Sequence, residues 1–251
     1  MLKKLPLSKN LNPHVSVDCV IFGYDERSLK VLLIERNGNE KKHKGKSSSN
    51  KALPGNLILD NEDLDTSAKR VLKELTGLEN IFLEQFYAFG NPDRVRKEQD
   101  MEWLKSIRAE PKARVITVAY YALVKINDYE TMPSGFAFKA EWVNVREVPK
   151  LSFDHNEVLE KALSVLQSRI RNFPVGYELL PKKFTLRDLQ HLYESILGKK
   201  LDKRNFRRKI LALQLVTPLK QVQSNVSHKP ALLYKFNLKE YNRLLKEKII
   251  F

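Results

Sequence analysis

The first part of the chain alternates short apolar runs with polar turns, and this pattern predicts a β-rich fold. Residues 15–24 and 30–36 are rich in β-branched and aliphatic side chains and are separated by a polar turn, so they predict a hairpin. Residues 115–126 form a continuous apolar run, which suits a central strand buried on both faces. Further strands are predicted over residues 81–89 and 140–145.

Apolar residues also recur at helical spacing in this part of the chain. One stripe consists of Leu64, Ala68, Val71, Leu72 and Leu75. Gly77 would end that helix. Residues 151–171 predict a long helix with Asp154 as its N-cap. Asp154 and His155 also allow a catalytic interpretation, but a cap residue and its neighbour at a helix start need no chemistry, and no partner nucleophile is visible.

Two polar segments interrupt this pattern. Residues 94–112 form a charged insertion around Trp103, which predicts a short helix. Residues 37–51 are polar, basic and rich in serine, with a cluster of lysines between residues 41 and 46. We interpret the second segment as a solvated loop and not as a nucleic-acid contact.

The last third of the chain begins with a helix break at residues 172–176, which marks a domain boundary. Residues 184–198 then predict a helix with Thr185 and Asp188 as a capping box and Gly198 as its end. Asp202 would cap a second helix over residues 203–213. Two apolar runs at residues 215–219 and 232–236 predict a β-hairpin. Helix, turn, helix and hairpin in this order resemble a winged helix-turn-helix, whose second helix enters the DNA major groove.

The strongly basic composition of the chain favours a polyanionic partner. The formal net charge is +15 and the pI is near 9.7. Residues 172–251 contain 17 Lys and Arg against 6 Asp and Glu, whereas residues 1–171 contain 28 against 24. The positive excess therefore belongs to the last third of the chain, where it favours DNA binding over a merely solvated basic face.

The second helix of this region has the layout of a recognition helix. Its basic side chains crowd one side while Phe206, Ile210 and Leu213 keep the other side for the core. Arg204 and Asn205 are the candidates for base reading, because arginine pairs bidentately with guanine and asparagine with adenine. Phosphate contacts are expected from lysines before the first helix and in the hairpin. The predicted DNA-contacting residues are Lys182, Lys183, Thr185, Lys203, Arg204, Asn205, Arg207, Arg208 and Lys229.

Other features bound the location and the class of protein. No run of eighteen apolar residues is present, which argues against a membrane span. Lys3 and Lys4 are not followed by an apolar segment, so no secretory signal is expected. Cys19 is the only cysteine and cannot form an intramolecular disulfide. These facts fit a cytoplasmic protein.

Residues 52–78 resemble the signature of Nudix hydrolases, G-x5-E-x7-R-E-U-x-E-E-x-G-U, where U is a bulky aliphatic residue. The matching positions are Glu62, Arg70, Leu72, Glu74, Gly77 and Leu78. The chain departs from the signature at Asn56, Val71 and Leu75, which stand where the family has its first glycine and two helix glutamates. The resemblance implies a Mg²⁺ cluster built from those glutamates, and Glu74 alone cannot supply it. We therefore expect a Nudix fold that has lost hydrolysis, although the same stripe would also suit any core helix.

A Nudix-like domain followed by a winged helix resembles the Nudix-related transcriptional regulators. Within that group the chain looks most like the sugar-responsive branch typified by the arabinose regulator of gut Bacteroides. The segments that carry this resemblance are residues 68–78, 153–155, 180–186 and 201–207. It implies a homodimer that is released from its DNA operator by a small ligand held in the former Nudix cleft, with no cofactor and no membrane partner.

The resulting hypothesis is an α/β protein with a Nudix-type α/β/α sandwich, a mixed sheet and a C-terminal winged helix-turn-helix. Its domains are an N-terminal arm (1–14), a ligand-binding domain (15–150), a linker helix (151–172) and a DNA-binding domain (173–251). We expect a repressor of carbohydrate-utilisation genes that binds a neutral polyol such as a pentose. The candidate ligand-binding residues are Asp18, Glu35, Glu74 and Asp93.

Two other functions remain open at this point. The chain could be a working Nudix hydrolase acting on nucleoside diphosphate derivatives such as ADP-ribose, with Glu62 and Glu74 holding one Mg²⁺. The residues that discriminate against this are Val71 and Leu75. A protein that uses the winged helix for structured RNA is disfavoured, because the sequence lacks paired exposed aromatic residues that would stack bases.

Overall fold

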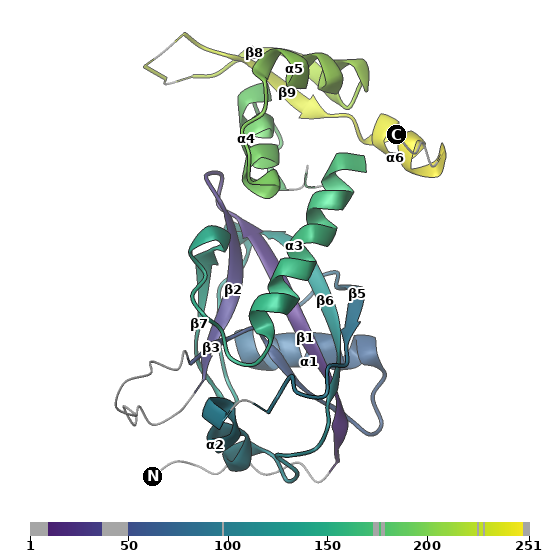
Figure 1. The fold of residues 1–251 in the computed structure, drawn as a ribbon. Helices are drawn as coiled ribbons and strands as arrows, with labels where there is room; N and C mark the ends of the chain where they lie inside the picture. The colour runs from purple at the N-terminus through teal and green to yellow at the C-terminus, as the bar shows by residue number, and fades with distance from the viewer. Residues whose placement is uncertain are drawn as a thin grey trace. The chain divides into compact units, whose positions relative to one another are not determined.

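A computed structural model describes residues 10–36, 50–96, 98–172, 176, 179–224, 226–227 and 229–247 (Figure 1). It divides into two compact units. The first consists of Met1–Gly23 and Lys30–Ala162, and the second of Tyr24–Leu29 and Leu163–Phe251. Three predicted segments lie wholly or partly outside the described residues: most of the N-terminal arm, the lysine cluster at residues 41–46 and the helix break after residue 172. The domain bounds given above therefore stay a prediction.

The strands of the first unit form a seven-stranded sheet in the described part of the chain. Its main path runs β3-β2-β1-β6-β5, and β4 pairs with β1 while β7 pairs with β2. The strands are β1 (Leu11–Tyr24), β2 (Leu29–Arg36), β3 (Lys51–Ala52), β4 (Gly55–Leu59), β5 (Glu84–Phe89), β6 (Ile116–Lys125) and β7 (Ala137–Asn144). The predicted hairpin of β1 and β2 and the strands β5, β6 and β7 are present. The short strands β3 and β4 were not predicted.

Helices cover both faces of this sheet. Figure 1 shows α1 (Leu64–Thr76) across one face and the first half of α3 (His155–Asn172) across the other. The first unit also contains α2 (Glu98–Ile107), the predicted short helix around Trp103, and two 3-10 turns, Ile126–Asp128 and Val145–Glu147. This arrangement confirms the predicted Nudix-type α/β fold with helices on either side of a sheet.

Helix α1 is set by its two ends and its apolar stripe. The Asp63 side chain accepts a hydrogen bond from the Thr66 amide, and Gly77 ends the helix in the left-handed conformation at φ 78°. Between these ends Ala68, Val71, Leu72 and Leu75 are buried in the core formed with β1, β2 and β6. The motif helix is therefore fixed to the sheet by the positions that depart from the Nudix signature as well as by those that match it.

The second unit contains the predicted winged helix. It consists of α4 (Leu186–Leu197), α5 (Lys203–Ala212), the antiparallel pair β8 (Val216–Val222) and β9 (Leu232–Phe236), and α6 (Leu238–Glu247). The predicted capping box of Thr185 and Asp188 is present, and Asp202 caps α5 through the Asn205 amide. The ring of Phe206 on α5 meets Tyr193 on α4 edge to face, with centroids 5.4 Å apart. Helix α6 was not predicted.

Helix α3 begins later than the sequence pattern predicts. It starts at His155, because Phe153 has a left-handed backbone at φ 57° and cannot continue a helix. Asp154 precedes the helix as predicted, but its carboxylate accepts hydrogen bonds from Arg94. The Asp154 side chain therefore forms an ion pair with Arg94. The prediction that it acts only as the N-cap of this helix is corrected accordingly.

No helix in the described ranges combines the length and the apolar character that a membrane span requires.

Candidate functional site

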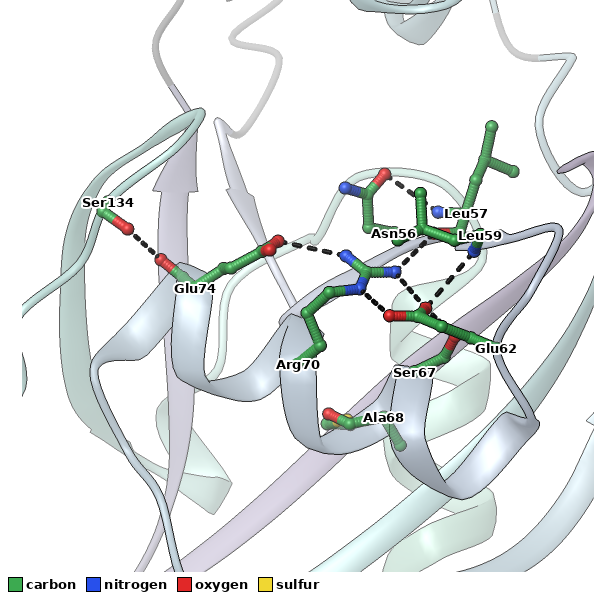
Figure 2. Close-up of polar contacts among 10 residues, drawn as sticks. Asn56, Leu57, Leu59, Glu62, Ser67, Ala68, Arg70, Glu74 and Ser134 are labelled. Atoms are coloured by element: carbon green, nitrogen blue, oxygen red, sulfur yellow. Dashed lines mark hydrogen bonds and ion pairs between the residues drawn. The ribbon is translucent and has the colours of Figure 1, made fainter. Parts of the chain in front are cut away.

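The Nudix-like motif is organised around Arg70 on α1, whose guanidinium lies between two carboxylates (Figure 2). Its Nε and Nη2 donate to the two oxygens of Glu62 at 2.7 and 2.9 Å, and its Nη1 donates to Glu74 at 3.1 Å. Nη2 also donates to the carbonyl of Leu57 in β4 at 3.2 Å. Arg70 thus ties the helix to the loop before it.

The Glu62 carboxylate is saturated by these contacts and two more. One of its oxygens accepts hydrogen bonds from the Ser67 hydroxyl at 2.5 Å and from the Leu59 amide at 3.3 Å. The hydrogen bonds from Arg70 hold the pKa of Glu62 below its usual range. Glu62 is thus an ionised structural carboxylate.

The motif does not fit a Mg²⁺ cluster. Glu62 is bonded on both oxygens, Glu74 is paired with Arg70, and Val71 and Leu75 are at most 1% exposed in the core. In the part of the chain that the structure describes, no three His, Cys, Asp or Glu side chains lie close enough to share a metal ion. A hard cation needs several free oxygen ligands, so no chemical step is assigned to a metal here.

Beside the motif lies a cavity that we call the α2 cavity. It encloses about 30 Å³, which is room for about one or two water molecules, and it opens to solvent. Its walls come from β1, from the loop and strand before α1, from α2 and the residues after it, and from the start of α3. Residues that line it include Asp18, Asn56, Arg94, Trp103, Arg108, Phe136, Phe153 and His155.

A buried ion cluster forms one wall of the α2 cavity. Arg94 donates to Asp18 at 3.1 Å and to both oxygens of Asp154 at 2.9 Å. Burial alone would raise the pKa of Asp18, but the charge and the hydrogen bond of the neighbouring Arg94 guanidinium help to lower that pKa. Asp18 is therefore ionised and already has a cation as partner.

His155 is part of the same wall and is held in one orientation. Its Nδ1 accepts a hydrogen bond from the Leu53 amide at 2.9 Å, and its Nε2 lies 3.6 Å from Asp18. Burial lowers the pKa of His155, so the ring is neutral near pH 7 and its proton is on Nε2. The sequence analysis considered a catalytic role for His155 and decided against it; the structure places the ring at the cavity.

A second buried pair fixes α2 beside the cavity. Arg36 on β2 donates to Asp100 at 3.2 Å and to the Ser152 hydroxyl, and Asp100 also accepts from the Phe153 amide at 3.0 Å. The Arg36 guanidinium lies 4.3 Å from the centre of the Trp103 ring. These contacts hold Trp103 and Phe153 as rigid walls of the cavity.

Arg108, like Arg36, has buried guanidinium nitrogens without a hydrogen-bond partner among the described residues. It follows α2 and lines the α2 cavity, and the atoms concerned are its Nε and Nη1. Burial lowers the pKa of Arg108 to about 10, so it is still a cation at neutral pH.

The four ligand-binding candidates do not converge, which corrects the sequence interpretation. Asp18 lines the α2 cavity, but Glu74 is bonded to Arg70 outside it. Glu35 lies opposite Lys139 and Lys51 in the sheet and does not line the cavity. Asp93 is 76% exposed and pairs with Arg96, while its neighbour Arg94 points inward. Residues in a turn have no fixed periodicity, so the sequence could not show whether Asp93 or Arg94 points toward the cavity.

The candidate DNA-binding face is built on α5. Lys203, Arg204, Asn205, Arg207 and Arg208 are exposed, while Phe206 and Ile210 are buried against the rest of the unit. Arg208 donates to the Asn205 side-chain oxygen at 3.0 Å, so these two side chains act as a pair. The spacing thus gives one basic side and one apolar side, as expected for a recognition helix.

The remaining DNA-contact candidates divide into two groups. Lys182, Lys183 and Lys229 are exposed, and Lys183 donates to Gln221 of β8 at 2.9 Å. Thr185, in contrast, is only 3% exposed, and its hydroxyl is used in the capping box of α4. The prediction of a Thr185 contact to DNA is corrected accordingly: its side chain shapes the helix start and is not on the surface.

Comparison with known proteins places both units. A NUDIX domain model matches residues 12–162, and a model described as the NrtR DNA-binding winged helix domain matches residues 176–236. A Nudix domain joined to such a winged helix defines a Nudix-related transcriptional regulator. The chain belongs to the NrtR family of these regulators.

Individual relatives agree with this family. The chain is 33% identical, over 92% of its length and 85% of the relative's, to a protein of Acinetobacter baylyi named ADPR responsive transcriptional repressor NtrR. It is similar to the crystal structure of Shewanella oneidensis NrtR complexed with a 27mer DNA, with a TM-score of 0.63 at 25% identity, over 91% of this chain and 95% of that one. It is also 28% identical to an ADP-ribose pyrophosphatase of Methanocaldococcus jannaschii over 64% of its own length and 80% of that protein's.

These relatives do not support the arabinose-regulator branch. The name of the Acinetobacter protein refers to ADP-ribose and not to a sugar. Most residues that carried the resemblance to the sugar-responsive branch belong to the core of α1 or to the starts of α4 and α5. Such residues specify the fold and not the effector, which is why that inference was wrong in its choice of branch.

Proposed function

We propose that the chain is a DNA-binding transcriptional repressor whose Nudix domain binds ADP-ribose as an effector without hydrolysing it. The observation that carries the proposal is the combination of an NrtR-type winged helix with a Nudix motif whose Glu62 is fully bonded within the protein. Similarity to the ADPR responsive repressor of Acinetobacter baylyi supports ADP-ribose as the effector. The similar Shewanella NrtR has been solved with DNA, which supports a double-stranded operator as partner.

In this proposal the winged helix reads the operator through α5, and the Nudix domain senses the ligand. Two copies of α5 in a homodimer would read half-sites about one helical turn apart, so the operator would be a near-palindrome. The regulated genes would then be ones whose expression follows ADP-ribose and not pentose supply. A DNA-binding regulator of this kind acts in the cytoplasm.

The test is a gel-shift titration of the full chain on DNA from upstream of its own gene. We expect a retarded complex that ADP-ribose dissolves and that arabinose at the same concentrations leaves intact. A ligand that binds the DNA-free form preferentially shifts the equilibrium only by its differential affinity, so release should be graded with ADP-ribose concentration. A complex that responds to arabinose and not to ADP-ribose would overturn the proposed effector.

A second function is favoured by one observation, the similarity to an ADP-ribose pyrophosphatase. A hydrolase would need Glu62 and Glu74 to release Arg70 and hold Mg²⁺. We expect no release of AMP from ADP-ribose in the presence of Mg²⁺. Metal-dependent turnover that disappears in Glu74→Gln would establish the hydrolase instead.

A further inference from the structure

The second unit, which holds the winged helix, also contains two segments from elsewhere in the chain. It includes Tyr24–Leu29, the turn of the β1–β2 hairpin, and it begins again at Leu163, in the middle of α3. Strands β1 and β2 and helix α3 therefore each have one part in the first unit and one part in the second. Elements of the Nudix fold thus contribute residues to the compact unit that carries the recognition helix.

The turn of the β1–β2 hairpin has a fixed shape. The Asp25 side chain accepts a hydrogen bond from the Ser28 amide at 2.8 Å. Glu26 has a left-handed backbone at φ 70°, which a residue other than glycine keeps only where its surroundings hold it. On either side of this exposed tip, Tyr24 and Leu29 are 1% and 3% exposed. The turn is therefore anchored in the second unit by two buried side chains.

Tyr24 lies beside one side of α4. Burial raises the pKa of Tyr24, and the charge of Asp188 on α4 raises it further, while the nearby Ser195 hydroxyl lowers it. Asp188 and Ser195 are seven positions apart, so they share one side of the helix. The Tyr24 hydroxyl is buried without a hydrogen-bond partner among the described residues, so packing of the ring holds this side chain in place.

The recognition helix packs against a different side of α4. Tyr193 is five positions after Asp188, which places it about 140° around the helix from Asp188 at 3.6 residues per turn. The Tyr193 ring meets Phe206 of α5 edge to face, with centroids 5.4 Å apart. Helix α4 therefore lies between the hairpin turn and the recognition helix.

The second half of α3 holds the end of the same helix. Gln167 donates a hydrogen bond to the carbonyl of Ile196, in the last turn of α4, at 3.0 Å. The Ile196 side chain is 1% exposed, and Leu166 and Ile170 on α3 are 0% and 3% exposed. Helix α4 is thus bound on one side by the turn after β1 and at its end by α3.

In the first unit, a buried ion cluster joins β1 to the start of α3. Arg94 pairs with Asp18 on β1 and with Asp154, the residue before α3. The two elements are therefore fixed to each other in the Nudix domain, and both contact α4 in the second unit. A change in the Nudix domain that moved either element would reach α4 through these contacts.

We propose that Tyr24 and Gln167 are positioning residues through which β1 and α3 hold α4, and with it the recognition helix, in the DNA-binding arrangement. This inference rests on the proposed function and deepens it, because the effector would release the operator through these two contacts. Coupling between two sites requires an element whose state both sites influence. Strand β1 and helix α3 meet that requirement, since each has residues in both units.

The experiment measures the operator dissociation constant of the full chain with and without saturating ADP-ribose. The ratio of the two constants is the coupling between effector and DNA. We expect Tyr24→Leu and Gln167→Ala each to reduce this ratio by about 2- to 30-fold, the range for residues that carry coupling. Both residues belong to the second unit, so the affinity of the DNA-free protein for ADP-ribose should stay as in the wild type.

Two further variants serve as controls. Tyr24→Phe keeps the buried ring and removes only a hydroxyl without a partner among the described residues, so it should keep the wild-type ratio. Tyr87→Leu makes the same change as Tyr24→Leu at a tyrosine of the Nudix domain that is 47% exposed. This variant should also keep the wild-type ratio.

Amide hydrogen exchange of the ligand-free full chain gives a second readout that does not depend on the effector. Because Tyr24 and Gln167 hold α4, Tyr24→Leu and Gln167→Ala should speed exchange in α4 and α5 and leave the Nudix sheet as protected as in the wild type. The Gln167 variant removes a hydrogen bond without opening a large cavity, so it decides the question if Tyr24→Leu does not fold.

The outcomes separate this proposal from the one it rests on. If neither variant changes the ratio or the exchange of α4 and α5, the positioning role is wrong. Loss of ADP-ribose binding together with faster exchange throughout the chain would make both side chains general core residues and would also overturn it. If ADP-ribose does not release the operator from the wild type, the proposed effector fails. Faster exchange confined to α4 and α5 would then still support the positioning role, and unchanged exchange would overturn it.

Discussion

At the residue scale, the most consequential side chain of the Nudix domain is Arg94. It is 3% exposed and pairs with Asp18 and Asp154, which come from opposite ends of the domain's sequence. Removing one member of a buried ion cluster leaves uncompensated charge, and this typically costs about 3 to 5 kcal/mol of the free energy of unfolding. We expect Arg94→Met to destabilise the domain by this amount at pH 7, measured by urea denaturation.

The loss should depend on pH with a defined sign. In the wild type the pKa of Asp18 is lowered, so its contribution to stability is present above the unfolded pKa of about 3.9 and is lost as pH falls. Without Arg94 the buried Asp18 carboxylate loses its cation, so burial favours its protonated form and the variant gains stability as pH falls. The difference between variant and wild type should therefore shrink between pH 7 and pH 4. Arg96→Met, which breaks only an exposed pair, should cost less than about 1 kcal/mol at either pH.

Sequence could anticipate part of this cluster and no more. Asp18 is a polar residue on a predicted strand that would flank the Nudix helix, and it was a candidate ligand-binding residue for that reason. Its partner Arg94 is 76 positions away, and the partner's other carboxylate, Asp154, is a further 60 positions on. The order of the strands and the path of the loops bring these residues together, so no local sequence pattern predicts the ion pairs. The buried Nε and Nη1 atoms of Arg108, which have no hydrogen-bond partner among the described residues, can likewise be recognised only from the folded structure.

At the element scale, the helices with strong end signals were predicted to within two residues. The capping box of α4 and the glycine ends of α1 and α4 depend on residues within one turn, so local sequence is enough. Strand β3 has two residues and β4 has five, and they flank Pro54 or begin at Gly55. Segments this short show no alternation of apolar and polar residues that would predict a strand. Tertiary pairing with β1 and β2 creates these strands.

The connection between α4 and α5 depends on a single carboxylate. Glu194 is 8% exposed and accepts hydrogen bonds from the Leu201 amide at 2.9 Å, from Gln190 at 3.0 Å and from Lys200 at 3.2 Å. The Leu201 amide is the main cause that lowers the pKa of Glu194 to about 2. This carboxylate fixes the turn that places the recognition helix.

Glu194→Gln should therefore change the acid stability of the winged helix. The wild-type carboxylate stabilises the fold above its unfolded pKa and stops doing so as pH falls through the window from about 4.5 to about 2. After allowance for solvent screening, the variant should lose about 1 to 2 kcal/mol at pH 7 and show a flatter pH profile in that window. Thermal unfolding followed by circular dichroism measures both. Glu160→Gln, an exposed change on α3, should leave the profile unchanged, and an identical profile for Glu194→Gln would contradict the assignment.

At the scale of the whole molecule, charge and chemistry are divided between the two parts of the chain. Residues 172–251 hold 17 Lys and Arg against 6 Asp and Glu, whereas the first 171 residues are nearly balanced at 28 against 24. Several cations of the Nudix domain are used in internal pairs, such as Arg94 with Asp18 and Arg70 with Glu62. The basic side chains of α5 are exposed instead. Phosphate attraction should therefore come from the winged helix, and its strength should depend steeply on salt.

This division predicts how substitutions will affect operator binding. We expect the triple variant Arg204→Ala, Arg207→Ala, Arg208→Ala to abolish specific binding, because these side chains occupy the exposed side of the recognition helix. Arg204→Ala alone should cost about 1 to 3 kcal/mol and relax specificity at one position. Lys229→Ala should weaken all sequences alike and reduce the slope of log affinity against log salt by about one.

The matched control carries the same loss of charge in the other unit. Lys112→Ala, Arg146→Ala, Lys150→Ala removes three exposed cations from the Nudix domain, so it tests whether net charge alone drives binding. Fluorescence anisotropy on operator and scrambled DNA at several salt concentrations measures affinity, specificity and slope together. The α5 triple variant should lose the difference between the two DNAs, and the Nudix triple variant should keep it. If both triple variants lost the difference in affinity between operator and scrambled DNA equally, binding would follow total charge. That result would contradict the assignment of α5 as the recognition helix.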